Sequence, residues 1–375
     1  MSFDDLNIKQ EILRGIYAYG FEKPSAIQLK SIPEIINKKD IIAQAQSGTG
    51  KTGAFTIGSL CNINTELKKS QILIILPTHE LVSQVHTVIS EISSYMNITI
   101  AKVIGGTNIS ESSYELSKNP EVIIGTPGRI LDMINRGNLL TDSFSMLIFD
   151  EADEILSKGF KDNIYNIVRV IPKTTQICLF SATLPDEILS ITDKFMNEPI
   201  KILVKNEELT LDGIQQYFVS VKNRDWKYDI IIDLYDAISV NQCIIYINNK
   251  NKIVDIYNKL IQENYPVSYI TGDRTSQERK DIMDDFRSGK IRILLSSDLL
   301  SRGIDIQQLS LVINYDIPRD KETYIHRIGR SGRYGRKGVA INLIHESEIT
   351  QLEEIQKFYN TQINEMPVNI SEIIN

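Results

Sequence analysis

Residues 40–52 read Asp-Ile-Ile-Ala-Gln-Ala-Gln-Ser-Gly-Thr-Gly-Lys-Thr, and this stretch decides the fold of the first half of the chain. Its apolar start, Asp40–Ala43, predicts a buried strand. The glycines that follow let backbone N–H groups turn toward an anion at the start of the next helix. Ala45 stands where this pattern usually opens with glycine, but the Gly-x-Gly-Lys-Thr core is intact. The stretch predicts a phosphate-binding loop in a parallel α/β sheet.

Each residue of this loop has an expected task. Lys51 would place a positive charge on the outer phosphates, and the Thr52 hydroxyl would be a magnesium ligand. The backbone of the loop would face the phosphate oxygens. The residues expected to do so are Ser47, Gly48, Thr49, Gly50, Lys51 and Thr52.

A second acidic motif follows a second buried strand. Met146–Phe149 leads directly into Asp150-Glu151-Ala152-Asp153. A carboxylate at the carboxyl end of a parallel strand is well placed to hold Mg²⁺, so Asp150 is a candidate metal ligand beside Thr52. Glu151 is a candidate to accept a proton from an attacking water. Taken alone, the same acidic residues would also suit the start of a helix.

Apolar β-rich runs alternate with longer segments of helical period along the whole chain, which predicts parallel α/β units. Helices are expected at 79–95, 278–288 and 346–360. The remaining predicted strands are Gln71–Leu76, Ile98–Val103, Val122–Gly125, Gln176–Phe180, Gln215–Val221, Cys243–Ile247, Val267–Ile270, Ile293–Ser296, Leu311–Asn314 and Gly338–Leu343.

The length of 375 residues suits two domains. The polar segment around residues 205–213 ends in Asp-Gly, a turn signal, and lies after the last predicted strand of the first half. We therefore expect an N-terminal domain over 1–205, a short flexible linker over 206–213 and a C-terminal domain over 214–375.

Composition restricts the function classes. Hydrophobic residues make up 42% and charged residues 24% of the chain, as in a globular protein, and no apolar run approaches the ~20 residues that span a membrane. Three scattered cysteines give neither a disulfide framework nor a zinc site, which favours a reducing compartment, the cytoplasm or the nucleus. The formal net charge is −7, so any nucleic-acid binding must be local. Residues 319–337 carry seven basic and two acidic residues, a local anion-binding candidate.

Asp-Glu-Ala-Asp at 150–153 resembles the motif that names the DEAD-box RNA helicases, and further motifs of that family follow in order. The resemblance covers nearly the whole chain and is strongest to the initiation-factor-4A type. It implies two tandem RecA-like domains, each a parallel β-sheet flanked by helices. It also implies ATP and Mg²⁺ as cofactors.

The resemblance assigns further residues to the nucleotide. Phe21 and Gln28 lie in a segment that resembles the adenine-reading Q motif, with Phe3 as its upstream aromatic residue. Asp305 would approach the ribose. Arg330 and Arg333, in His326-Arg327-Ile328-Gly329-Arg330-Ser331-Gly332-Arg333, resemble arginine fingers that reach the γ-phosphate. The catalytic set implied is Lys51, Glu151, Arg330 and Arg333.

Other motifs of the family concern coupling and RNA. Ser181 and Thr183 are expected to hydrogen-bond to Asp153 and to link the nucleotide state to domain closure, with Arg302 and His326 as further coupling residues. Small residues and backbone amides would approach the RNA backbone without reading base identity. The implied RNA-binding residues are Pro77, Thr78, Gly105, Gly106, Thr126, Pro127, Gly128, Arg129, Asn248, Gly272, Ser297 and Asp298.

Two positions depart from the family pattern. His79 stands where arginine is usual, and Ser276 stands where glutamine is usual. A histidine is largely neutral at pH 7. Both positions lie in elements expected to serve RNA binding and inter-domain coupling, so these changes bear on RNA affinity and coupling more than on hydrolysis.

The leading hypothesis is an ATP-dependent RNA helicase that couples hydrolysis to local unwinding, in a process like translation initiation. Its partners would be single-stranded or short duplex RNA, bound with little sequence specificity, and regulatory proteins; we expect a monomer and no membrane. One alternative is an ATP-gated RNA clamp that acts as a scaffold in an RNA-processing complex. Another is a DNA-directed motor built on the same two domains.

Overall fold

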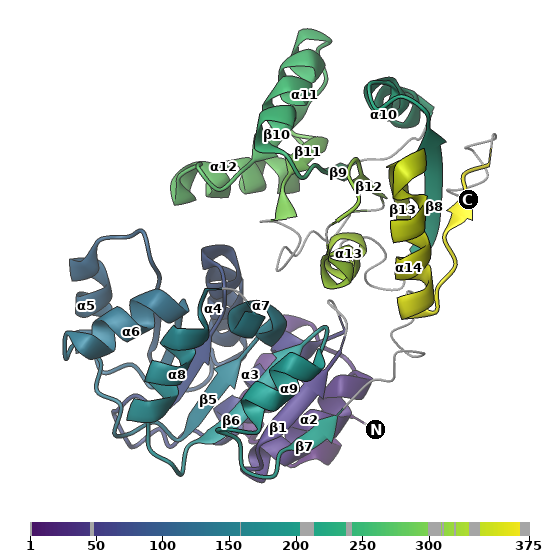
Figure 1. Ribbon diagram of the computed structural model, residues 1–375. Coiled ribbons are helices and arrows are strands. Elements are labelled where there is room, and N and C mark those ends of the chain that lie inside the picture. Colours follow the sequence, from purple (N-terminus) through teal and green to yellow (C-terminus); the bar gives the residue numbers. More distant parts are fainter. Residues whose placement is uncertain are drawn as a thin grey trace. The chain divides into compact units, whose positions relative to one another are not determined.

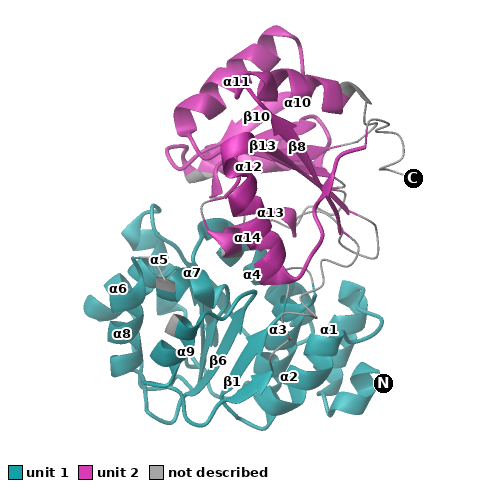
Figure 2. Ribbon diagram, turned by 45° about the vertical axis from the view of Figure 1, so that its right-hand side comes forward, with its two compact units in different colours: residues 1–204 teal, residues 205–375 magenta. Residues whose placement is uncertain are grey.

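The computed structural model describes residues 2–45, 49–157, 159–202, 214–237, 242–298, 309, 311–318, 320–329 and 338–367. The chain divides into two compact units, residues 1–204 and 205–375 (Figure 2). The expected linker, 206–213, lies outside the described residues. No helix among the described residues is long and apolar enough to cross a membrane.

The first unit contains a seven-stranded parallel sheet in the order β3-β4-β2-β5-β6-β1-β7. Six of its strands lie where the sequence predicts them, within two residues at each end. The short edge strand β7 was missed, because three residues with only partial burial give too little periodicity to recognise. The strands are β1 (Ile41–Gln44), β2 (Ile72–Ile75), β3 (Ile100–Val103), β4 (Val122–Gly125), β5 (Met146–Phe149), β6 (Gln176–Ser181) and β7 (Ile200–Ile202).

Helices cover both faces of this sheet (Figure 1). Alternate residues of each strand point to opposite faces, so Ile72 and Ile74 pack on one side and Leu73 and Ile75 on the other. The helices α1 to α4 pack on the first face and α5 to α9 on the second. Their bounds are α1 (Gln10–Tyr19), α2 (Ala26–Ile36), α3 (Lys51–Cys61), α4 (His79–Ile92), α5 (Ile109–Ser117), α6 (Pro127–Asn135), α7 (Ala152–Ser157), α8 (Lys161–Val170) and α9 (Asp186–Thr192), after a 3₁₀ turn η1 (Phe3–Leu6).

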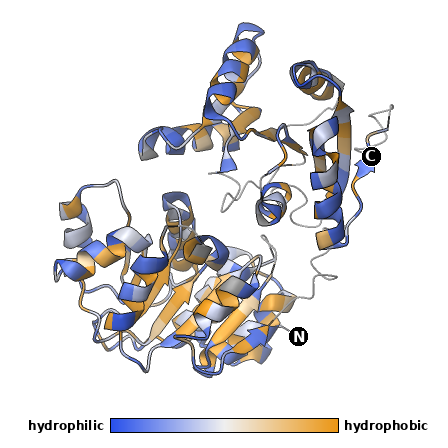
Figure 3. Ribbon diagram, viewed as in Figure 1, coloured by the Kyte–Doolittle hydropathy of each residue, from blue (hydrophilic) through white to orange (hydrophobic). Residues whose placement is uncertain are grey.

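Strands buried on both faces explain why they read as continuous apolar runs. In Figure 3 the strands of this sheet are mostly hydrophobic, while the covering helices turn hydrophilic residues outward. Each fully buried Ile or Phe side chain contributes about 1.5–3 kcal/mol relative to exposure. One contact is closer than usual: a Cβ added at Gly15 would lie 1.8 Å from the Ile92 carbonyl oxygen, so only glycine lets α1 approach the end of α4.

The second unit contains its own seven-stranded parallel sheet, in the order β10-β11-β9-β12-β13-β8-β14. All its predicted strands are present, and the two-residue strand β14 was missed. The strands are β8 (Ile214–Val221), β9 (Cys243–Tyr246), β10 (Val267–Ile270), β11 (Ile293–Ser296), β12 (Leu311–Asn314), β13 (Gly338–His345) and β14 (Asn364–Glu365).

Helices flank this sheet as well (Figure 1). The helices α10 and α11 pack on one face, and α12, α13 and α14 supply core residues to the other. The predicted helix over 346–360 is a 3₁₀ turn followed by an α-helix. The bounds are α10 (Trp226–Ala237), α11 (Lys250–Gln262), α12 (Ser276–Arg287), α13 (Lys321–Ile328), η3 (Glu346–Glu348) and α14 (Ile349–Tyr359).

The two sheets share one topology. Numbered from its own first strand, each unit has the order 3-4-2-5-6-1-7. Two parallel sheets flanked by helices confirm the predicted fold class, including the shared architecture of the two halves. Because all strands of each sheet are parallel, their carboxyl ends lie at one edge, where ligand sites of open α/β sheets form.

Candidate functional site

The phosphate loop joins β1 to α3 in the first unit. Gly50 has a φ of +102°, a backbone conformation that glycine adopts readily, and α3 begins at the next residue, Lys51. A Cβ at Gly50 would lie 2.8 Å from Gln28 Nε2, so the glycine also permits a close approach of the Q-motif segment. Thr49 and Gly50 are described, whereas Ser47 and Gly48 lie outside the described residues.

Lys51 is a buried cation. Its side chain is 6% exposed, and its Nζ has no hydrogen-bond partner among the residues that the structure describes. A buried ammonium group without a partner is unfavourable, and a bound anion would relieve that cost. Thr52, half-buried, is the following residue of α3. The geometry at Lys51 therefore fits a phosphate group.

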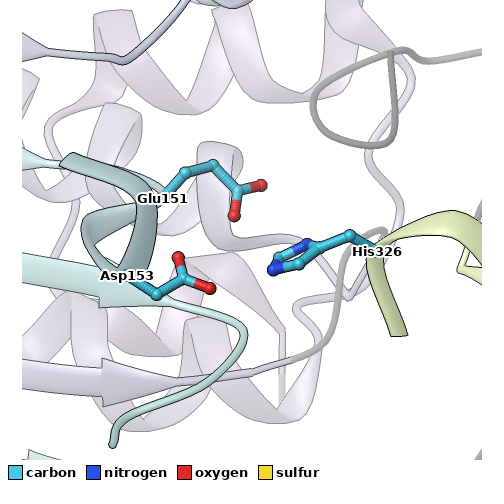
Figure 4. Close-up of side chains that lie close together, drawn as sticks. All are labelled: Glu151, Asp153 and His326. Atoms are coloured by element: carbon cyan, nitrogen blue, oxygen red, sulfur yellow. The ribbon is translucent and has the colours of Figure 1, made fainter. Parts of the chain in front are cut away.

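Asp150 and Glu151 follow the carboxyl end of β5. Burial raises the pKa of Asp150 to about 7, against the lowering effect of the Lys51 charge, and the Glu151 charge raises it further. Glu151 has a φ of +52°, an uncommon conformation for a side chain of its size, and its N–H donates to Asp150 Oδ1 at 2.9 Å. Figure 4 shows the Glu151 and Asp153 side chains extending to the same side of this segment. A carboxyl group with a pKa near 7 and a cation beside it can exchange a proton for a metal ion.

Asp153 is held by the segment after β6. Thr183 Oγ1 donates to Asp153 Oδ2 at 2.9 Å, the Asp153 N–H donates to Ser181 Oγ at 3.3 Å, and Ser181 Oγ donates to the Thr183 carbonyl at 2.6 Å. The hydrogen bonds expected between these residues are therefore present. Asp153 also lies in the first turn of α7. The acidic motif therefore serves both as the start of a helix and as part of the carboxyl edge of the sheet.

The Q-motif segment packs directly on the phosphate loop. Gln28 is 3% exposed; its Oε1 accepts the Ser25 N–H at 2.9 Å, and its Nε2 donates to the Gly50 carbonyl at 3.2 Å. A Cβ at Gly53 would lie 2.5 Å from Gln28 Nε2 and 2.9 Å from Phe21 Cε2. Gln28 thus connects the start of α2 to the loop, and among the described residues its amide nitrogen donates only to Gly50, which leaves its second hydrogen for a ligand.

The two aromatic residues of this segment have different positions. Phe21 is half-buried, whereas Phe3 is fully buried and stacks on Phe21 with ring centroids 6.2 Å apart. Phe3 therefore has no exposed ring face for a base. It supports Phe21 from the protein interior.

The predicted RNA-binding residues of the first unit gather at three neighbouring strands. They follow the carboxyl ends of β2, β3 and β4, which are adjacent in the sheet. Thr78 caps α4 by accepting the Leu81 N–H at 3.3 Å, and Thr126 precedes Pro127 at the start of α6. A cavity of about 360 Å³ lies here, and it is lined by Pro77, His79, Gly105, Thr126, Gly128, Arg129, Asp132 and Phe160.

Local geometry at this cluster suits a nucleic-acid backbone. The Gly105 N–H donates to Thr126 Oγ1 at 3.3 Å, and Gly106 has a φ of +74°. The N-termini of α4 and α6 lie at the same sheet edge, and their partial positive charge attracts phosphate. The helix N-termini and backbone N–H groups thus supply local positive potential in a chain whose net charge is −7.

Arg129 differs from its expected part in this cluster. Its guanidinium donates to the Thr107 carbonyl at 2.8 Å and to Ser112 Oγ at 2.9 Å, and its side chain is half-buried. At least two of its five N–H donors are therefore used within the protein. Arg129 holds the loop before α5 while it lines the cavity.

The predicted RNA-binding residues of the second unit occupy the equivalent edge. Asn248, Gly272 and the pair Ser297 and Asp298 follow β9, β10 and β11, which are neighbours in that sheet. Gly272 is exposed with no atom within 4 Å of an added Cβ. Asn248 instead donates through Nδ2 to the Ile317 carbonyl at 2.9 Å and accepts from Arg327. Its side chain is engaged by the protein itself.

Arg327 is a residue of this edge that the sequence analysis did not single out. Its side chain has no exposure, and it donates to Asp298 Oδ1 at 2.7 Å, to Asn248 Oδ1 at 2.6 Å and to the Asp316 carbonyl at 2.6 Å. Its guanidinium also lies 5.1 Å from the Tyr246 ring. The helical spacing of Thr323, Tyr324 and Arg327 marks an inward face, which could have identified it. The sequence analysis placed Arg327 in the basic run and in the motif at 326–333 and gave it no role of its own.

The remaining expected residues divide into two groups. His326 is fully buried on α13 of the second unit and is drawn in Figure 4. The others lie outside the described residues, and they are Ser47, Gly48, Arg302, Asp305, Arg330 and Arg333.

Comparison with known families follows the same division of the chain. Residues 25–191 match the DEAD/DEAH box helicase family, and residues 226–335 match the helicase conserved C-terminal domain. The chain belongs to the DEAD-box helicase family. It is a DEAD-box RNA helicase, an ATP-dependent enzyme with two tandem RecA-like domains, as the sequence analysis predicted.

Several DEAD-box proteins are similar over the full length of the chain. The ATP-dependent RNA helicase eIF4A of Meyerozyma guilliermondii is 52% identical over 374 residues, which cover 100% of this chain and 94% of the relative. That of Candida albicans is 53% identical over 371 residues, 99% of this chain and 94% of the relative. The structure is similar to S. cerevisiae Dbp5 bound to RNA and ADP BeF3, with a TM-score of 0.93 and 35% identity, covering 99% of this chain and 97% of Dbp5.

Proposed function

We propose that this DEAD-box protein hydrolyses ATP in an RNA-dependent manner and uses the cycle to separate short RNA duplexes in translation initiation. The observation that carries the proposal is the buried Lys51 ammonium, which has no hydrogen-bond partner in the described part of the chain and lies beside Asp150 and Glu151. This cluster lies at the same sheet edge as the glycine- and helix-rich RNA cluster after β2, β3 and β4. The eIF4A names of its relatives support the process.

The first unit holds the nucleotide in this proposal. Lys51 neutralises the outer phosphates, and the backbone of residues 47–52 donates to their oxygens. Phe21 and the remaining Gln28 hydrogen face the base. Thr52 and Asp150 hold Mg²⁺, which when bound would offset negative charge on the phosphate oxygens. Asp305 of the second unit faces the ribose.

Hydrolysis requires both units in this proposal. Glu151 accepts a proton from the attacking water. Arg330 and Arg333 supply fixed positive charge to the γ-phosphate, because guanidinium groups stabilise charge spread over transferring oxygens. Ser181 and Thr183 hold Asp153, and with Arg302 and His326 they transmit the nucleotide state between the units. ATP bound to the first unit alone is expected to react slowly.

RNA binds through backbone contacts in this proposal. The first unit contributes the residues after β2, β3 and β4, and the second unit contributes Asn248, Gly272, Ser297 and Asp298. Contacts to phosphate and sugar fix position without reading bases, and 2′-hydroxyl contacts would distinguish RNA from DNA. Dbp5 with 35% identity is known bound to RNA, which supports this assignment. We expect a monomer in the cytoplasm that is regulated by protein partners.

The test is ATP hydrolysis by the purified chain with and without single-stranded RNA. We expect strong stimulation by RNA and little by DNA of the same sequence. Glu151→Gln should abolish turnover and retain nucleotide binding, whereas Lys51→Ala should weaken both. Arg333→Ala should lose turnover and retain binding. Equal turnover with and without RNA, or stimulation by DNA alone, would overturn the proposal.

A second measurement separates a helicase from an ATP-gated clamp. The lifetime of the RNA complex with a non-hydrolysable ATP analogue is measured beside the rate at which the protein unwinds duplexes with ATP. A helicase unwinds several duplexes within one such lifetime. A long-lived complex with negligible unwinding would assign the clamp instead.

A further inference from the structure

A cavity of about 810 Å³ lies in the first unit at the amino ends of β6, β1 and β7, which are neighbouring strands (Figure 1). Three segments line it: the turn before β1, the connection from α8 to β6, and the segment before β7. Lys51 and Asp150 lie at the carboxyl edge of the same sheet. The cavity therefore lies at the opposite edge from the nucleotide and RNA clusters, and no step proposed above uses it.

Positive side chains surround this cavity. Lys38, Lys39 and Lys173 line it, are exposed, and make no ion pair with any residue in the described part of the chain. Lys194 also lines it, with its Nζ 5.9 Å from the Tyr165 ring centroid. Four lysines in one place are notable in a chain whose net charge is −7. An anionic group entering the cavity meets cations that are not already neutralised.

Gln176, one of the residues that line the cavity, has a buried amide with one unused atom. Gln176 is 5% exposed, and its Nε2 donates to the Ile35 carbonyl at 3.2 Å and to the Lys39 carbonyl at 2.6 Å. Both amide hydrogens are therefore used, which fixes the orientation of the group. Its Oε1 is buried and has no hydrogen-bond partner among the described residues. A ligand N–H would satisfy this acceptor.

The acidic residues of the cavity do not cancel its positive charge. Asp40 Oδ1 accepts the Ile177 N–H and Oδ2 accepts the Asn197 N–H, each at 2.8 Å, so this carboxylate ties the strand starts together. Burial raises the pKa of Asp40 above its ordinary value, and both of its carboxylate oxygens already accept hydrogen bonds within the protein. Glu198 is the other carboxylate at the rim. The lysines outnumber the two carboxylates by two to one.

We propose that this cavity binds an acidic segment of a partner protein. Carboxylates of the segment pair with Lys38, Lys39 and Lys173, and one of its backbone N–H groups donates to Gln176 Oε1. An apolar side chain packs against the cavity wall formed by Val168, Phe195 and Met196. Charge complementarity of this kind speeds association and selects acidic partners.

A peptide suits the cavity better than a nucleic acid. The Asp40 and Glu198 carboxylates interrupt the lysines and would repel a continuous row of phosphates. A peptide carries isolated carboxylates, apolar side chains and N–H donors, which are the three features that the cavity complements. The RNA-binding candidates of this unit all lie at the other sheet edge.

The test uses the full chain and a fluorescein-labelled peptide, Asp-Glu-Leu-Glu-Asp-Leu-Asp-Glu, with binding followed by fluorescence anisotropy. The variant Lys39→Glu with Lys173→Glu reverses two exposed lysines of the cavity. Its matched control, Lys69→Glu with Lys102→Glu, makes the same charge change at exposed lysines of the same unit that do not line the cavity. We expect about tenfold weaker peptide binding in the first variant and less than about twofold in the control.

RNA-stimulated ATP hydrolysis is measured beside binding in both variants. We expect it to be unchanged in both, since the cavity is remote from the nucleotide and RNA clusters. Absence of peptide binding to the intact chain, or equal binding by both variants, would overturn the proposal. So would loss of affinity for single-stranded RNA only in the Lys39→Glu, Lys173→Glu variant, because it would assign the cavity to nucleic acid. Loss of RNA-dependent hydrolysis in the intact chain would instead contradict the proposed function.

Discussion

The Thr183 hydroxyl donates a hydrogen bond to the Asp153 carboxylate at 2.9 Å across two segments that are 30 residues apart. Both side chains are buried, so water cannot replace this bond without cost. The bond connects the segment after β5, which carries Asp150 and Glu151, to the segment after β6. A change at the nucleotide can thus be passed to a second part of the first unit.

We expect Thr183→Val to uncouple unwinding from hydrolysis. The substitution keeps the shape of the side chain and removes the donor to Asp153, and the loss of this buried hydrogen bond to a carboxylate costs about 1–3 kcal/mol. ATP affinity should change little, and duplexes unwound per ATP hydrolysed should fall several-fold. Thr192→Val is the matched control, because the Thr192 hydroxyl donates only to the Leu189 carbonyl in its own helix. Equal unwinding by both variants would contradict this role for the bond.

Asp150→Asn should stabilise the nucleotide-free protein at neutral and higher pH. The folded-state pKa of about 7 lies above the ordinary value of 3.8, so the folded state holds a proton that the unfolded state releases between those values. Stability conferred by this proton is complete at low pH and is lost as the pH rises through 7. The asparagine variant lacks that loss, so its gain in stability over the wild type should be about 2 kcal/mol larger at pH 8 than at pH 5.5. Thermal unfolding near pH 5.5 and pH 8 measures it.

The exposed Asp162 offers the control for this experiment. The unfolding temperature of Asp162→Asn should match that of the wild type at both pH values. If Asp150→Asn raised the unfolding temperature by the same amount at both pH values, titration of this carboxyl group would be excluded as the cause.

Two glycines of α3 allow nucleotide binding and stability to be separated. At Gly53 an added Cβ meets Gln28 Nε2 at 2.5 Å and Phe21 Cε2 at 2.9 Å, whereas at Gly58 it meets Ile35 side-chain atoms at 2.8 Å. Gly53→Ala should therefore weaken ATP binding about tenfold with little loss of stability, because it displaces the base-facing residues. Gly58→Ala should lower the unfolding temperature and leave the affinity for ATP intact. Calorimetric titration and thermal unfolding of both variants test the contrast.

Arg327→Lys should destabilise the second unit selectively. Lysine cannot replace the planar set of donors that joins Asp298, Asn248 and Asp316, and breaking such a buried network costs about 3 kcal/mol. Hydrogen exchange of β9, β11 and β12 amides should accelerate. Arg287→Lys is the control, since Arg287 is 50% exposed and pairs only with Asp284 in its own helix among the described residues. Unchanged exchange in the Arg327 variant would show that the network is dispensable.

His79→Arg should strengthen RNA binding. His79 lines the cavity after β2, and its Nε2 lies 3.5 Å from a Cβ built at Gly105. An arginine there adds one permanent charge to a cluster whose other arginine, Arg129, donates to Thr107 and Ser112 within the protein. The slope of log affinity against log salt concentration should become steeper by about 0.7 for single-stranded RNA. An unchanged slope would show that the new side chain does not reach a phosphate.

Much of the fold could be predicted from the sequence, because strands buried on both faces read as short apolar runs. Edge strands β7 and β14 were not predicted, because strands of three and two residues are too short to show an alternating hydrophobic pattern. The site motifs identified their strand ends correctly, but contacts of single side chains depend on packing between distant segments. The internal hydrogen bonds of Arg129 and Arg327 and the burial of Phe3 are of this kind, and local sequence does not encode them.

The identical strand order of the two sheets also bears on stoichiometry. In the first sheet the connection after β1 carries Gly-Thr-Gly-Lys-Thr, whereas the counterpart after β8 reads Lys222-Asn223-Arg224-Asp225 and has no glycine. Of two sheets with the same strand order, only the first therefore has a glycine-containing loop after its first strand that can bind a triphosphate. Each polypeptide should consume a single ATP per cycle. The second unit, which has no such loop after β8, would respond to that one hydrolysis event.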